Sequence, residues 1–181
     1  MTVKDDPREN LAQLVAMVSE LDRYLDAGRP YRSVVADWPG GGHETVTLSL
    51  GVVLDLVAVL ERSAARLTDD ERGTFADAVA SLRVVRAGRR DDYGAMLTHE
   101  LHSQLDAWRW FVDDCTRGEC AGGDLYRREV ARRRRVDQLL TEGATLGVDL
   151  SEARDRTAAL DRALRSRFVP GAYCGPPGEV Q

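Results

Sequence analysis

The chain has few aromatic residues, one lysine and no long apolar run, and each shortage excludes a class of function. Aromatic residues make up 6% of the 181 residues, and Lys4 is the only lysine among 25 basic residues. Single-stranded nucleic acid is usually bound by basic side chains interleaved with aromatic ones, so nucleic acid is not an expected partner. The longest apolar run, residues 46–60, is shorter than the roughly 20 residues of a membrane-spanning helix and contains an aspartate. We therefore expect no membrane partner.

The three cysteines, Cys115, Cys120 and Cys174, have no metal-type spacing, and the first residues contain no apolar signal core. These features predict a cytoplasmic location with reduced thiols, in which Cys115 is packed on a helix and Cys120 lies in a loop. A redox pair is the alternative. The sequence also contains no phosphate-binding glycine loop and no Ser-His-Asp spacing, so neither nucleotide binding nor serine hydrolase chemistry is indicated.

The composition is that of an ordinary globular domain, with 43% hydrophobic and 30% charged residues. The net charge of −5 does not favour general adhesion to nucleic acid or anionic lipid. The charge is uneven, because residues 1–116 carry an acidic excess and residues 117–168 a basic excess.

Helix-capping residues and apolar periodicity divide the chain into about six helices, and Thr68 with Glu71 three residues later is predicted to form a capping box. Residues 29–43, rich in proline and glycine, are expected to form a loop that packs back on the helices. We predict an all-α fold: a single-domain antiparallel helical bundle over residues 1–168, followed by an irregular Pro/Gly tail at residues 169–181. The expected helices run from Pro7 to Gly28, over residues 46–60, from Thr68 to Gly88, from Asp91 or Asp92 to Gly118, from Asp124 to Thr141, and from Asp149 to Phe168.

The helix that ends near Gly118 has the strongest periodicity, and helical geometry gives it two organised faces. One face is apolar and carries Leu97, Leu101, Leu105, Trp108, Val112 and Cys115. The opposite face forms a polar and aromatic stripe of His99, His102, Asp106, Trp110 and Asp113.

Two functions are compatible with the polar stripe. His99, His102 and Asp106 could hold a divalent metal as part of a small hydrolytic enzyme, with Glu100 or Asp55 handling protons and a further ligand from another helix. The alternative is a solvated His-Asp face without metal. Asp55 itself is expected on a wet edge of its helix, because an isolated buried carboxylate is costly. The alternative is an inward Asp55 that meets Arg132 or a histidine and forms a polar centre in the bundle.

A contact surface for protein partners or self-association is the second possibility for the stripe. An exposed tryptophan is costly to leave in water, so Trp110, His102 and Asp113, with Trp38 of the loop, are the expected interaction residues. The sequence as a whole predicts a helical interaction or oligomerisation protein.

Arg132 to Arg135 follow one another on the fifth expected helix and cannot all face solvent. An inward ion pair of Glu129 with Arg132 is predicted. The outer arginines Arg128, Arg134 and Arg135 form a candidate anion or phosphate-backbone site, with a solvated basic face as the alternative.

Overall fold

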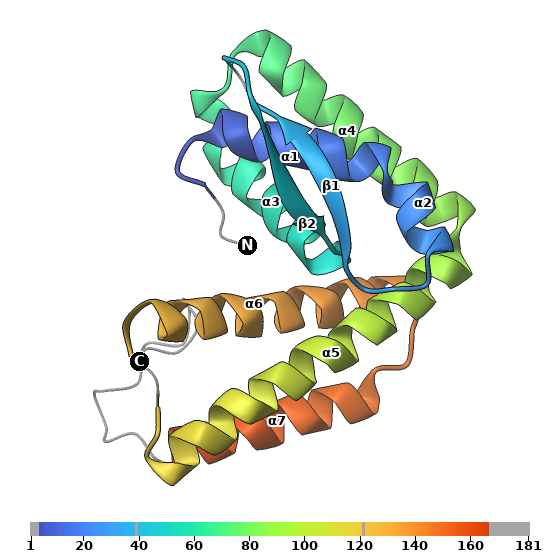
Figure 1. Cartoon of the computed structure of the whole chain (residues 1–181). Coiled ribbons are helices and arrows are strands. Elements are labelled where there is room, and N and C mark those ends of the chain that lie inside the picture. Colours follow the sequence, from blue (N-terminus) through green and yellow to red (C-terminus); the bar gives the residue numbers. More distant parts are fainter. Residues whose placement is uncertain (1–3, 39, 121, 167–181) are drawn as a thin grey trace. The chain divides into compact units, whose positions relative to one another are not determined.

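The computed structural model shows a predominantly α-helical protein (Figure 1), as the sequence predicted. The part of the chain that it describes contains seven α-helices and one two-stranded sheet. Within that part, no helix is both long and apolar enough to cross a membrane. The described residues are 4–38, 40–120 and 122–166.

The chain divides into two compact units, Met1–Glu100 and Leu101–Gln181, which are described separately. The boundary falls inside the long helix α5, Arg90–Arg117, so each unit receives one part of this helix. A single domain over residues 1–168 stays a prediction, and the expected tail at residues 169–181 lies outside the described residues.

Unit 1 is organised around its first helix, α1, which packs against α3, α4 and the first strand. The expected helix from Pro7 to Gly28 is two helices that meet at Glu20. Asp6 caps α1 by accepting a hydrogen bond from the backbone N–H of Arg8 at 2.9 Å. The helices of this unit are α1 (Pro7–Ser19), α2 (Leu21–Asp26), α3 (Leu50–Ser63), the short 3-10 helix η1 (Ala64–Arg66), α4 (Asp69–Gly88) and the first part of α5.

A β-hairpin replaces the expected loop, so that prediction was wrong. Strand β1 (Arg32–Asp37) pairs antiparallel with β2 (His43–Leu48), with Val34 opposite Val46 and Val35 opposite Thr45. Alternate residues of β1 are buried, as expected for a strand with one face on a core. The helix expected over residues 46–60 therefore begins only at Leu50, after the second strand.

Local capping chemistry fixes the start of α4 as predicted. The Thr68 hydroxyl accepts a hydrogen bond from the Glu71 N–H at 3.3 Å, and the Glu71 carboxylate accepts one from the Thr68 N–H at 2.7 Å. This reciprocal capping box satisfies two backbone donors that the first helical turn leaves without partners. Asp91 and Asp92 lie in the first turn of α5, which begins at Arg90, rather than at its cap.

Unit 2 consists of the second part of α5 with α6 (Gly123–Leu146) and α7 (Ser151–Arg165). Helix α6 begins one residue before its expected cap, Asp124, and continues past its expected end at Thr141 until Gly147, whose φ of 73° ends it. The backbone N–H of Gly147 donates a hydrogen bond to the Ala144 carbonyl at 3.1 Å. The core of the unit is an apolar cluster of Trp108, Phe111, Val112, Cys115 and Leu164.

Candidate functional site

The two faces predicted for α5 are present. The six residues of the apolar face, from Leu97 to Cys115, are all buried. On the polar stripe, His99, His102, Asp106 and Trp110 are exposed, while Asp113 is half-buried. The prediction of a two-sided helix is therefore confirmed.

The predicted metal ligands do not form a cluster in the structure. Among the described residues, no group of three or more His, Cys, Asp or Glu side chains is placed to hold a metal ion. Asp106 instead forms an ion pair with Arg156 of α7, with 2.5 Å between the carboxylate and the guanidinium. This hydrogen bond lowers the pKa of Asp106 below its usual value, and nearby His102 also contributes. The Asp106 carboxylate thus joins two helices of unit 2.

Trp110 is the most exposed tryptophan in the described part of the chain, and its neighbour Trp108 shows how unusual that position is. Trp110 is 60% exposed, with the Arg109 guanidinium 5.7 Å from its ring. Trp108 is 3% exposed and stacks on Phe111 at 5.3 Å. Trp38, expected on the same interaction surface, belongs to unit 1, where it is half-buried with Lys4 Nζ 5.5 Å from its ring.

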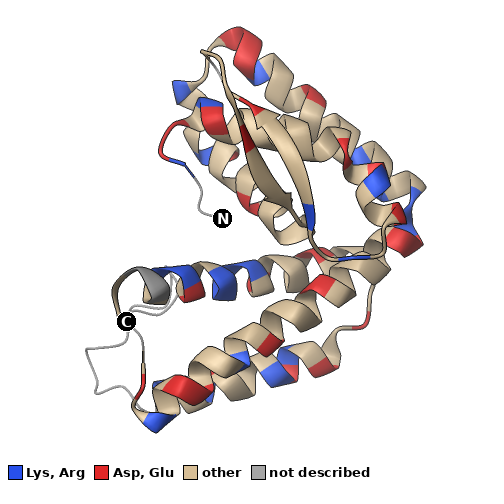
Figure 2. Cartoon of the chain, in the orientation of Figure 1, with Lys and Arg blue, Asp and Glu red and all other residues tan. Residues whose placement is uncertain are grey.

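The arginines of α6 divide into structural and surface residues. The predicted inward pair is confirmed: Arg132 Nε donates to Glu129 Oε2 at 2.8 Å, and Glu129 is buried. Arg132 also donates to Gln104 Oε1 of α5 at 3.1 Å. Of the candidate anion-binding residues, Arg128 is exposed while Arg134 and Arg135 are half-buried. Figure 2 shows basic residues along much of α6.

An ion-pair network that sequence reasoning missed holds unit 2 together. The Arg133 guanidinium donates to both carboxylate oxygens of Asp161 in α7, with distances of 2.7 to 3.1 Å. Asp161 also accepts a hydrogen bond from Trp108 Nε1 at 3.3 Å. Burial by itself lowers the pKa of Arg133, but the bonds to Asp161 and Asp137 outweigh it and raise this pKa above its usual value. The network joins α5, α6 and α7.

Unit 1 has two buried carboxylates, and the sequence predicted a wet position for one of them, Asp55. Asp55 is 1% exposed, so the expectation that it lies on a wet edge of its helix was wrong. Glu100 is fully buried, and its Oε1 accepts a hydrogen bond from the Gly51 N–H at 3.1 Å, in the first turn of α3. Burial, followed by the Glu100 charge, raises the pKa of Tyr24 above its usual value. These buried groups are parts of the core of unit 1.

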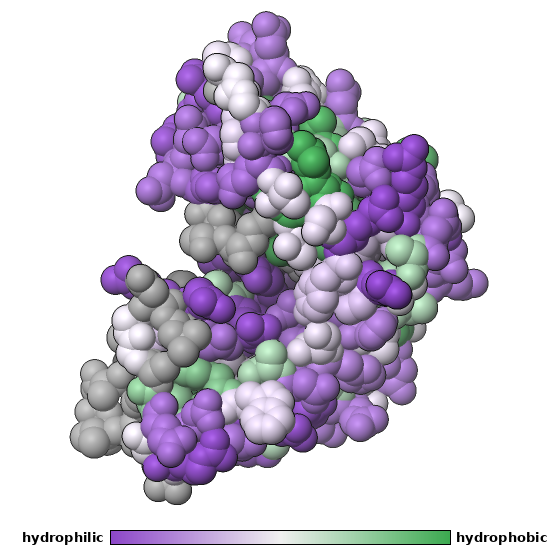
Figure 3. Space-filling model, viewed as in Figure 1, coloured by the Kyte–Doolittle hydropathy of each residue, from purple (hydrophilic) through white to green (hydrophobic). Residues whose placement is uncertain are grey.

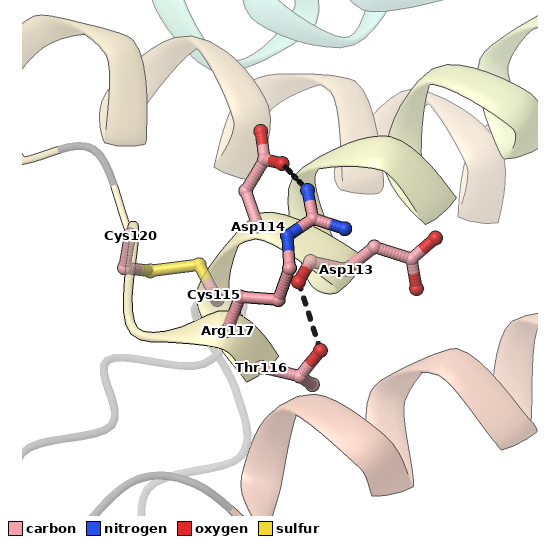
Figure 4. The surroundings of a disulfide bond; sticks show 6 residues. All are labelled: Asp113, Asp114, Cys115, Thr116, Arg117 and Cys120. Atoms are coloured by element: carbon pink, nitrogen blue, oxygen red, sulfur yellow. Dashed lines mark hydrogen bonds and ion pairs between the residues drawn. A yellow bond between two sulfur atoms is a disulfide. The ribbon is translucent and has the colours of Figure 1, made fainter.

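Cys115 and Cys120 form a disulfide (Figure 4), so the expectation of two separate reduced thiols was wrong. Gly118, with a φ of 86°, ends α5, and its N–H donates to the Cys115 carbonyl at 3.1 Å. This left-handed residue reverses the chain and returns Cys120 to the helix end. Cys174 lies outside the described residues. The cytoplasmic location stays a prediction.

The structure also contains a surface groove that the sequence analysis did not identify. We call it the hairpin groove; it lies along β1, with α1 as its floor and α4 at one end, and has a volume of about 440 Å³. Val15 of α1 is 39% exposed and Val35 of β1 is 57% exposed. Figure 3 shows a hydrophobic area over β1 and α1, bordered by hydrophilic residues. The groove is lined by Arg8, Leu11, Ala12, Val15, Ala16, Ser19, Val35, Asp37, Glu71 and Thr74.

The groove continues along β1 towards the start of the strand. A second hollow shares Ala16, Ser19 and Val35 with it and adds Glu20, Ser33, Val34 and Thr45. Charged residues stand at the other end, where Arg8 Nε lies 3.0 Å from Glu71 Oε1. The whole depression is therefore long, apolar along its middle and charged at both ends, with Glu20 at one and Arg8 with Glu71 at the other.

Comparison of the chain with protein-family models, with curated proteins and with solved structures gives no match.

Proposed function

We propose that the protein is an interaction module that binds an extended polypeptide segment in the hairpin groove. The sequence predicted an interaction protein from the stripe on α5, and the groove offers this function a site of defined shape. One observation carries the proposal: the groove combines exposed valines with an edge of β1 that has no neighbouring strand in the described part of the chain. Among the described residues, β1 pairs only with β2.

The hydrogen-bonding pattern of the hairpin indicates which groups face the groove. At the turn, the Trp38 N–H donates to the Gly42 carbonyl at 2.9 Å. Because bonded and non-bonded pairs alternate in an antiparallel ladder, Ala36 and Val34 follow as residues bonded to β2. The backbone N–H and C=O groups of Ser33, Val35 and Asp37 then point towards the other edge. An extended segment placed there would find both donors and acceptors.

The apolar floor supplies the second part of the interaction. Val15 and Val35 are both partly exposed, and burying an apolar side chain yields about 25 cal/mol per Å² of area removed from water. Natural edge strands are commonly protected by charged side chains, by proline or by a covering helix or loop. The charged residues of β1, Arg32 and Asp37, lie at its two ends, and its middle contains neither a charge nor a proline. This edge therefore has the chemistry of a strand-addition site.

Selection of peptides from a random eight-residue display library on the full-length chain tests this function. We expect enriched peptides with alternating apolar residues that bind the unmodified chain. Val35→Lys should weaken their binding about tenfold or more, because the charge enters the centre of the site. The matched control is Val84→Lys, since Val84 is 71% exposed on α4 and does not line the groove. If no peptide is enriched on the chain in its monomeric state, or if enriched peptides bind both variants equally, the proposal is wrong.

A further inference from the structure

The outward-facing residues of β1 are complementary to a reversed copy of themselves. Placing two β1 strands antiparallel with Val35 opposite Val35 brings Ser33 of each strand opposite Asp37 of the other. Both positions are exposed, and neither side chain is part of the hairpin's buried face. Resting on the proposed function, we propose that the occupant of the hairpin groove is β1 of a second copy of this chain. The two hairpins would then form one four-stranded antiparallel sheet about a two-fold axis.

The backbone supports this pairing in both directions. Ser33, Val35 and Asp37 each direct one N–H and one C=O towards the edge, by the alternation fixed at Trp38 and Gly42. In the Val35-centred register, the residues whose backbone groups point to the edge on one strand lie opposite the same kind of residue on the other strand. The pairing provides about six backbone hydrogen bonds between the copies.

The side chains select this register over its neighbours. The Ser33 hydroxyl of one strand can donate a hydrogen bond to the Asp37 carboxylate of the other, and the two-fold axis provides this contact twice. The two Val35 side chains meet at the centre, where a directly opposed β-branched pair is favourable. A slip of two residues in one direction would place Asp37 opposite Val35, and in the other direction opposite Tyr31. Either slip loses both hydroxyl-carboxylate contacts.

A second copy suits this edge because an isologous contact uses the same surface on both partners. The strand must then complement itself, and the sequence from Ser33 to Asp37 does so. The contact also brings the partly exposed Val35 side chains of the two copies together. A different partner makes the same side-chain contacts only if it has a hydroxyl opposite Asp37 and a carboxylate opposite Ser33.

Sedimentation velocity of the full-length chain over a range of micromolar concentrations tests the proposal. We expect the unmodified chain to form a dimer. Both Val35→Lys and Val35→Glu should raise the dissociation constant about tenfold or more, because each places like charges directly opposite one another. An equimolar mixture of the two variants should recover the dimer, since Lys and Glu then face each other. Val84→Lys should dimerise like the unmodified chain.

The outcomes separate this inference from the proposed function. Loss of the dimer in each Val35 variant with recovery in the mixture supports the Val35-centred pairing, because a purely structural role of Val35 would not be restored by mixing. A strictly monomeric unmodified chain, a dimer unaffected by both variants, or a mixture that stays monomeric overturns it. A monomeric chain that still binds the selected peptides overturns the self-pairing and leaves the proposed function standing. A monomer that binds no peptide contradicts both.

Discussion

Asp161 accepts hydrogen bonds from two other helices of unit 2, and replacing it by alanine should strongly destabilise that unit. Its side chain is 16% exposed and that of its partner Arg133 is 11% exposed, so the ion pair is mostly removed from water. Breaking a buried pair by removing one partner costs about 3 to 5 kcal/mol, because a buried charge loses its compensation. The cost here falls near the lower end of that range, because Arg133 still has its ion pair with Asp137, whose Oδ1 lies 2.5 Å from Arg133 Nη1. The released Trp108 N–H adds about 1 kcal/mol.

We therefore expect Asp161→Ala to lower the free energy of unfolding by about 3 to 4 kcal/mol. Asp137→Ala is the matched control, because it removes the other carboxylate of the same arginine. The Asp137 side chain is 47% exposed, so this change should cost about 1 kcal/mol or less. Asp161→Asn should give an intermediate loss, since the amide oxygen still accepts hydrogen bonds but carries no charge.

Urea denaturation followed by tryptophan fluorescence and by far-UV circular dichroism measures these differences. The comparison is valid where the free energy of unfolding falls with urea concentration at the same slope in all variants. If Asp161→Ala costs less than about 1 kcal/mol, or no more than Asp137→Ala, the network does not stabilise unit 2 as argued.

Three further changes test the exposure of Trp110, the capping box of α4 and the disulfide. Trp110→Ala should change the free energy of unfolding by no more than about 0.5 kcal/mol in urea denaturation, because the side chain is largely exposed; a loss above about 2 kcal/mol would mean that it is packed. The hydrogen bond from the Thr68 N–H lowers the pKa of Glu71 below its usual 4.5. The ionised Glu71 carboxylate therefore stabilises the folded state above pH 4.5, and this stabilisation is lost as the pH falls through the folded-state pKa. Glu71→Gln should therefore show a smaller fall in melting temperature on acidification than the unmodified chain, and equal falls would contradict this. Reduction of the Cys115–Cys120 disulfide should cost about 2 kcal/mol, given its short loop. Alkylation of both thiols in unreduced protein, read by mass spectrometry, would refute the bond.

Elements that form through interactions between residues close in the sequence could be predicted from the sequence. The capping box at Thr68 and the apolar face of α5 depend on residues three or four positions apart, and both were predicted. The inward pair of Glu129 with Arg132 has the same spacing and was also predicted. Helical periodicity is a local property, so it is visible in the sequence without knowledge of the partner element.

The hairpin was missed because a strand is stabilised mainly by its neighbours. Only two of the six residues of β1, Val34 and Ala36, are buried, and the adjacent glycines favoured a loop. Only pairing with β2 and packing on α1 make that segment a strand. The hairpin groove was missed for the same reason, since it exists only where β1, α1 and α4 meet.

The sequence by itself determined that this chain is mostly helical, where several helices begin and end, and that α5 has one apolar and one polar face. Tertiary structure decided which charged residues are buried. Arg133 reaches Asp161 across 28 positions, and no local pattern distinguishes it from Arg134. Backbone hydrogen bonds and side-chain periodicity act over a few residues, whereas burial depends on which helices become neighbours. For that reason the helices could be read from the sequence and the polar contacts between them could not.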